Sequence, residues 1–138
     1  MYIVVLMMGW FLFACTNMDN PKTEILETHE ISVCGVNNPL QEIEWLKDYC
    51  DNIKEKNEFP TVRISLYKVV DKDEHIFCIT IPSPIEYAQN QYYSTLFFRD
   101  CYGVTIFYWE TVTPPGGLYH DFMKDKEYVE DIFEFNKQ

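Results

Sequence analysis

Apolar residues recur every three or four positions between residues 39 and 56, which is the spacing of one face of an amphipathic helix. Asn38 is a favourable N-cap residue, Pro39 suits the first helical position, and Pro60 stops any continuation. The pattern therefore predicts a helix over about residues 39–56. The apolar positions on its buried face are Leu40, Ile43, Leu46, Cys50 and Ile53.

From Thr61 onward the apolar residues alternate with polar ones, which is the period of a half-buried strand. A charged turn is predicted at residues 71–74 and a tight turn at residues 100–103, where Gly103 can adopt a positive φ. The fold expected is therefore α+β: a four-stranded antiparallel meander with the N-terminal helix packed on one face. The four predicted strands cover residues 61–70, 75–81, 92–99 and 104–111.

The C-terminal part of the chain begins with a break at residues 113–117, which contain two prolines and two glycines. After this break, the apolar residues Tyr128, Val129, Ile132 and Phe133 lie at helical spacing. Acidic residues surround them. The spacing predicts a short acidic C-terminal helix.

Aromatic and apolar residues are expected on both faces of the predicted sheet. Alternation places Tyr93, Phe97, Phe107 and Trp109 opposite a second set, which consists of Tyr92, Leu96, Phe98, Ile106 and Tyr108. One helix covers only one face, so either the C-terminal segment folds over the other face or an aromatic patch stays exposed. An exposed patch of this kind marks a binding surface for protein or glycan. The candidate residues for it are Tyr67, Tyr93, Phe97, Phe107 and Trp109.

The N-terminal segment is typical of a secretory signal. Residues 1–14 carry no charge, and the apolar run from Tyr2 to Phe13 is shorter than the roughly 20 residues of a membrane-spanning helix. The sequence Leu12-Phe13-Ala14-Cys15 resembles a bacterial lipobox, which implies that Cys15 becomes the lipid-modified first residue of the mature protein, carrying palmitate. A cleavable signal followed by an ordinary cysteine, or a buried N-terminal strand, is the alternative.

This interpretation divides the chain into three parts: a signal peptide at 1–14, a lipidated cysteine with a polar tether at 15–33, and one α+β domain at 34–138. A short edge strand is predicted at the end of the tether, over residues 30–33. The expected location is the bacterial cell envelope, with the protein held to the outer membrane by its lipid alone.

Four cysteines remain after Cys15, namely Cys34, Cys50, Cys78 and Cys101. In an oxidising envelope this even number permits up to two disulfides with three connectivities, and free buried thiols are the alternative. The spacings contain no Cys-x-x-Cys pair, which gives zinc binding and thioredoxin-like chemistry little support. The sequence alone does not select a pairing.

Two segments resemble a signature of small Bacteroidetes-type lipoproteins of unknown function. The first runs from Cys34-Gly35 through Asn38-Pro39-Leu40 to Trp45-Leu46-Lys47, and the second is the turn Asp100-Cys101-Tyr102-Gly103. Together with the lipobox these motifs touch about a quarter of the chain. The resemblance implies a cell-envelope location and an approximate α+β layout, and it implies no activity.

Charge and motif content favour a binding protein over an enzyme. The net charge of −11 and the pI near 4.5 argue against nucleic acid, because no basic stripe is present to neutralise phosphates. The sequence contains no serine-hydrolase elbow, zinc-protease motif, phosphate loop or EF-hand. His29, His75 and His120 are far apart, so neither a metal site nor a cofactor is expected.

We therefore expect a non-catalytic binding or accessory lipoprotein with a protein partner, and an inhibitor or immunity protein is one form that it could take. The negative charge favours a basic partner, whose capture it would accelerate. A glycan-binding lipoprotein, with aromatic side chains stacking on sugar rings, is one alternative. A small hydrolase that uses His120 and Asp121 is the other.

Overall fold

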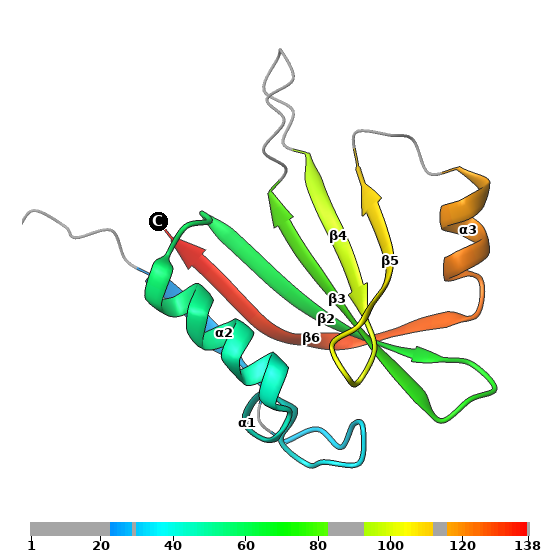
Figure 1. The fold of residues 1–138 in the computed structure, drawn as a ribbon, viewed down its shortest axis with the longest axis horizontal. Helices are drawn as coiled ribbons and strands as arrows, with labels where there is room; N and C mark the ends of the chain where they lie inside the picture. Colours follow the sequence, from blue (N-terminus) through cyan, green and yellow to red (C-terminus); the bar gives the residue numbers. More distant parts are fainter. Residues whose placement is uncertain (1–22, 29, 83–92, 112–115, 138) are drawn as a thin grey trace, which may run out of the picture.

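The computed structural model describes residues 23–28, 30–82, 93–111 and 116–137. It is an α+β fold built on one antiparallel sheet in the order β1-β6-β2-β3-β4-β5 (Figure 1). The strands are β1 (Thr23–Glu27), β2 (Thr61–Val69), β3 (Glu74–Pro82), β4 (Ser94–Arg99), β5 (Thr105–Glu110) and β6 (Lys126–Lys137). The helices are α1 (Pro39–Glu42), α2 (Glu44–Lys56) and α3 (Gly117–Met123).

The central part of the sheet is the predicted antiparallel meander of β2, β3, β4 and β5. The prediction of four strands is nevertheless wrong, because the sheet has six. The two additional strands, β6 and β1, join beside β2 and extend the sheet on that side (Figure 1).

The segment predicted as a C-terminal helix is the long strand β6. Its apolar residues lie at helical spacing because two register shifts interrupt its pairing with β2. Val129 and Ile132 each stand as an extra residue at one of these shifts, which is the arrangement of a β-bulge. The bulges, rather than a helix, therefore produce the spacing of Tyr128, Val129, Ile132 and Phe133.

Strand β1 lies inside the segment that the sequence assigns to the tether. It pairs with β6 in regular register, from Thr23 opposite Lys137 to Glu27 opposite Phe133. The edge strand predicted over 30–33 is absent, since these described residues contain only an isolated bridge between Val33 and Val36. The signal peptide, Cys15, His29 and Tyr92 lie outside the described residues.

The predicted helix is present in two pieces, because Ile43 adopts an extended conformation between α1 and α2. Pro39 is at the start of α1, and Asn57 ends α2 in the left-handed conformation with φ of 51°. The main core lies between α2 and one face of the sheet. Leu46, Cys50 and Ile53 of α2 are buried there against residues that include Val62, Ile64, Leu66, Phe77, Ile79, Phe133 and Phe135.

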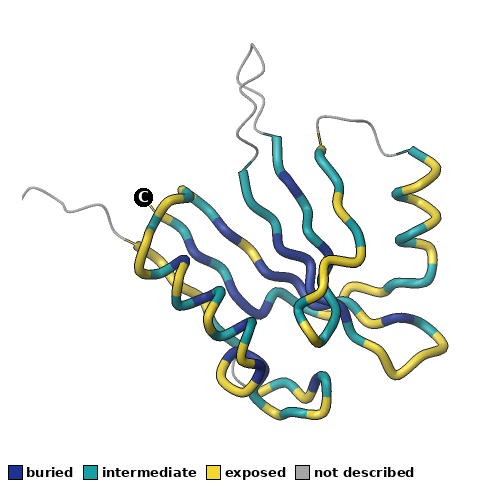
Figure 2. The backbone as a smooth tube through the Cα atoms, in the orientation of Figure 1, coloured by how far each residue is buried: buried dark blue, intermediate teal, exposed yellow. Residues whose placement is uncertain are grey.

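The opposite face of the sheet is partly covered by α3, which stands at the far end of the sheet from α2 (Figure 1). Tyr119, Phe122 and Met123 of α3 pack against a second buried cluster that includes Phe98 and Cys78. The C-terminal part of the chain thus covers part of this face, which is one of the two predicted alternatives. The covering segment is α3, residues 117–123, and not the helix predicted around residues 128–133. Figure 2 shows that α3 itself has an exposed outer side.

Candidate binding surfaces at the two edges of the sheet

The turn between β4 and β5 is attached to the N-terminal part of the domain by a disulfide between Cys34 and Cys101. The indole Nε1 of Trp45 also donates a hydrogen bond of 3.0 Å to the carbonyl oxygen of Cys101. Gly103 lies directly beneath the same indole, since a Cβ added there would be 2.7 Å from Trp45 Cγ. We call these four residues the hairpin corner.

The hairpin corner joins segment 34–47 to the turn at residues 100–103. Asp100 completes its turn by accepting hydrogen bonds of 2.9 Å from the amides of Tyr102 and Val104. Gly103 has a φ of 83°, a conformation that favours glycine. The guanidinium of Arg99 lies over the rings of Trp45 and Tyr49, 5.6 and 5.4 Å from their centroids. These contacts hold the start of β5 in a defined position.

The edge of the sheet that follows this corner exposes apolar side chains. Tyr102, Val104, Ile106 and Tyr108 are 88%, 57%, 44% and 47% exposed, and we call them the β5 surface. Figure 2 shows exposed residues along this strand and the turn before it. Tyr108 lies opposite Phe97 of β4, and their ring centroids are 5.4 Å apart. Exposed apolar side chains at one edge of a sheet are typical of a binding surface.

The register of the hairpin separates the aromatic residues proposed from the sequence. Phe98 pairs with Phe107, and Phe97 pairs with Tyr108, so Phe97 lies on the face opposite Phe107 and Trp109. The predicted grouping of Phe97 with Phe107 is therefore wrong. Alternation determines the face within one strand, whereas the turn and the register shift after Phe98 relate the two strands.

Most of the predicted aromatic surface is packed against other side chains. Phe107 stacks on Phe122 of α3 at 4.2 Å, and Trp109 lies 5.4 Å from Tyr119. Tyr67 packs in the same cluster, where burial raises its pKa to about 12. Phe97 packs against the core under α2, and Tyr93 is partly buried before β4. The exposed residues of the β5 surface, which sequence reasoning missed as a site, alternate with these packed ones.

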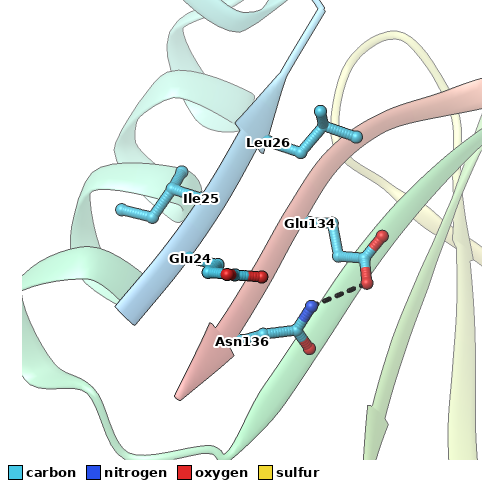
Figure 3. Close-up of a pocket in the computed structure, with 5 residues that line it drawn as sticks. All are labelled: Glu24, Ile25, Leu26, Glu134 and Asn136. Carbon is cyan, nitrogen blue, oxygen red and sulfur yellow. Dashed lines mark hydrogen bonds between the residues drawn. The ribbon is translucent and has the colours of Figure 1, made fainter. Parts of the chain in front are cut away.

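The second edge of the sheet contains a shallow groove of about 500 Å³. We call it the β1 groove, and it is lined by Glu24, Ile25, Leu26, Glu134 and Asn136. Figure 3 shows them along β1 and the neighbouring part of β6. The Asn136 amide donates a hydrogen bond of 2.8 Å to Glu134. Sequence reasoning missed this groove, because β1 and β6 are far apart in the chain.

The remaining cysteines, Cys50 and Cys78, are buried free thiols. They belong to the two different cores, on opposite faces of the sheet, so the fold keeps them apart. Burial raises the pKa of each thiol to about 12, which leaves little thiolate at neutral pH. The structure thus contains one disulfide, between Cys34 and Cys101, and two free buried thiols, Cys50 and Cys78.

The candidate catalytic pair, His120 and Asp121, lies on the exposed side of α3. The imidazole of His120 has an aromatic neighbour in Tyr119, with ring centroids 6.1 Å apart. His75 lies at the start of β3, where burial lowers its pKa. Across the described residues, no group of three or more His, Cys, Asp or Glu side chains is arranged to hold a metal ion.

Comparisons with known proteins return no relative. No family model, no curated protein and no solved structure matches this chain. Within the described part of the chain, none of the helices has the length and apolar character needed to cross a membrane.

Proposed function

We propose that this protein is a non-catalytic binding module of the bacterial cell envelope that binds a basic protein partner through the β5 surface. The observation that carries the proposal is the exposure of Tyr102, Val104, Ile106 and Tyr108 beside a hairpin corner that is fixed by a disulfide. A preorganised surface loses less conformational entropy when it binds. The rigid attachment of an apolar edge therefore supports a role in binding.

The charge of the chain supports a basic partner. A net charge of −11 attracts a cationic protein over a distance and raises the rate of its capture. An inhibitor or immunity protein for a basic toxin or hydrolase is the form of module that best uses this attraction. Added salt should slow the association, and an association rate that does not change with salt would contradict the electrostatic part of the proposal.

The direct experiment is affinity capture of full-length protein from its native envelope. We expect one dominant partner with the wild type and its loss with the double variant Ile106→Ser, Tyr108→Ser, because a polar β5 surface buries less apolar area. Leu118→Ser is the matched control, since Leu118 is 77% exposed on α3 outside the β5 surface. Equal capture by all three proteins, or no specific partner, would overturn the proposal.

A second part of the proposal concerns the attachment of the module to the outer membrane. The lipobox-like segment ending at Cys15 supports a lipid anchor on that residue. We expect Cys15→Ser to move the protein from the membrane fraction to the soluble fraction and to remove lipid from the mature N-terminus, as read by mass spectrometry. A variant that remains in the membrane fraction would contradict lipid anchoring at Cys15. Binding at the β5 surface is tested separately, by the capture experiment.

A further inference from the structure

Strand β1 has an outer edge whose backbone groups point away from the sheet. The Thr28 amide donates a hydrogen bond of 2.9 Å to the carbonyl of Ile132. Because bonded and non-bonded pairs alternate along an antiparallel ladder, the same side of β1 bonds to β6 at Leu26 and Glu24. The backbone groups of Ile25 therefore point toward the outer edge, where no described strand pairs with β1.

The opposite side of β6 confirms this assignment. The Lys137 amide donates a hydrogen bond of 2.8 Å to the carbonyl of Pro60, which places Lys137 and the alternate residue Phe135 on the side that bonds to β2. Phe135 pairs with Ile25 in the register of β1 and β6. The backbone bonds of Phe135 are directed to β2 and not to β1. The N–H and C=O groups of Ile25, which lies opposite Phe135, are therefore directed outward, away from β6.

The side chains at this edge suit an extended segment that contributes some apolar residues. Ile25 and Leu26 are 46% and 55% exposed, and both line the β1 groove. In Figure 3 Leu26 lies on the side of Glu134, and Ile25 lies on the side of α2. An added strand would place alternate side chains on both of these sides. Within β1, residues 23–27, there is no proline or lysine to protect the edge strand, and the charged residues are Glu24 and Glu27.

The charge of the groove selects a basic segment. Lys54 forms an ion pair with Glu27, and Arg63 forms one with Asp131. Glu24 and Glu134, which line the groove, form no ion pair among the described residues. Glu24, on β1 itself, favours lysine or arginine at the facing position of an added strand, because opposite charges on neighbouring strands attract. Glu134 lies one strand further in, on β6, and adds to the negative charge of the groove.

We propose that β1 binds an extended, basic segment of the protein partner as an additional antiparallel or parallel strand of the sheet. This inference rests on the proposed function, since it specifies how a basic partner is held. The β1 edge suits strand addition better than β5, because its pairing is regular, whereas the ladder of β4 and β5 contains a register shift after Phe98. Backbone bonds provide the affinity, and the groove carboxylates provide the preference for basic residues.

The test uses an amidated octapeptide of alternating valine and lysine as a probe, with alternating valine and glutamate as the charge control. Full-length protein is titrated with each peptide up to millimolar concentration while amide exchange is followed by NMR. We expect the lysine peptide to slow exchange of the Ile25 amide at least tenfold and the glutamate peptide to have no effect. No binding, protection confined to other residues, or slow exchange of this amide before peptide is added would overturn the proposal.

Two substitutions of one residue separate backbone from side-chain effects. Ile25→Pro removes the outward amide at an edge position that tolerates proline, whereas Ile25→Ala shortens the side chain and retains the amide. We expect proline to weaken binding of the lysine peptide at least tenfold more than alanine. Equal affinities of the two variants would overturn strand addition. Unchanged far-ultraviolet circular dichroism in both variants confirms that the sheet is intact.

The same variants distinguish this inference from the proposed function. If the β5 surface variant no longer captures the native partner but Ile25→Pro captures it as well as the wild type, strand addition is overturned and the proposed function stands. Loss of capture with Ile25→Pro, but not with Ile25→Ala, would support strand addition. Glu24→Gln combined with Glu134→Gln should lower the affinity for the lysine peptide at least threefold, and an unchanged affinity would contradict the role of the groove carboxylates.

Discussion

The two edges of the sheet are built in different ways. The β5 edge begins at the hairpin corner, where a disulfide, an indole hydrogen bond and the Gly103 contact connect it to the rest of the domain. The β1 edge is held by its pairing with β6 and by the ion pair between Glu27 and Lys54. One edge is thus fixed by covalent and packing contacts, and the other by backbone pairing and charge.

This difference is consistent with the distinct roles that we propose for the two edges. At β5 the aromatic residues that face α3 are packed, while Ile106 and Tyr108 remain exposed on a strand of defined position. Such a surface recognises a partner by the shape of its side chains. At β1 the outward backbone groups have no partner among the described strands and lie beside acidic side chains, which suits recognition of an extended basic segment.

Removal of the disulfide should have the largest effect. We expect Cys34→Ser combined with Cys101→Ser to lower the free energy of unfolding by about 2–4 kcal/mol, because the bond closes a long loop, with a sequence separation of 67 residues. Amide exchange should accelerate more in β5 than in β1. Urea unfolding followed by tryptophan fluorescence measures the first effect, with reduced wild type as the control. A loss below about 0.5 kcal/mol would contradict a structural role for this bond.

Substitution of Gly103 should have the next largest effect. Gly103→Ala should cost about 2–3 kcal/mol, because it combines an unfavourable positive φ with displacement of the Trp45 indole. Gly35→Ala is the matched control, since Gly35 has a φ of 80° but nothing within 4 Å of an added Cβ. It should cost about 1 kcal/mol. Equal losses would show that the contact with Trp45 adds nothing to the hairpin corner.

The smallest effect is expected at β1. Lys54→Met should lower the free energy of unfolding by about 0.5–1 kcal/mol, because the pair with Glu27 is only partly exposed. Exchange of the Leu26 amide should accelerate while β5 is unchanged. Lys47→Met, which breaks a more exposed pair with Asp51 within α2, is the control and should leave β1 unaffected. Faster exchange at both edges would contradict their separate attachment.

The sequence predicts the elements whose patterns are local. The apolar spacing of α2 and the alternation of β2, β3, β4 and β5 are local, so these elements lie close to their predicted bounds. Strand β6 is missed because its bulges imitate helical spacing, and β1 is missed because its five residues acquire their role only by pairing with the distant β6. Helix α3 has seven residues, too few for a clear period.

The candidate surfaces are harder to predict than the elements. The sequence marks the cysteines and the aromatic residues, but the pairing of Cys34 with Cys101 depends on how the N-terminal loop meets the hairpin turn. The separation of exposed Tyr108 from packed Phe107 depends on the register of β4 and β5. The β1 groove requires the contact of two segments from opposite ends of the domain. Tertiary pairing, rather than local composition, decides these features.

The most direct test of partner binding at the sheet edges is residue-level amide exchange of the full-length protein, alone and with the partner isolated by capture. We expect slower exchange at the two sheet edges, centred on Tyr108 and Ile25, with little change at His120 and Asp121 of α3. Protection centred on α3, with both edges unchanged, would contradict the central claim that this protein binds its partner through the edges of its sheet.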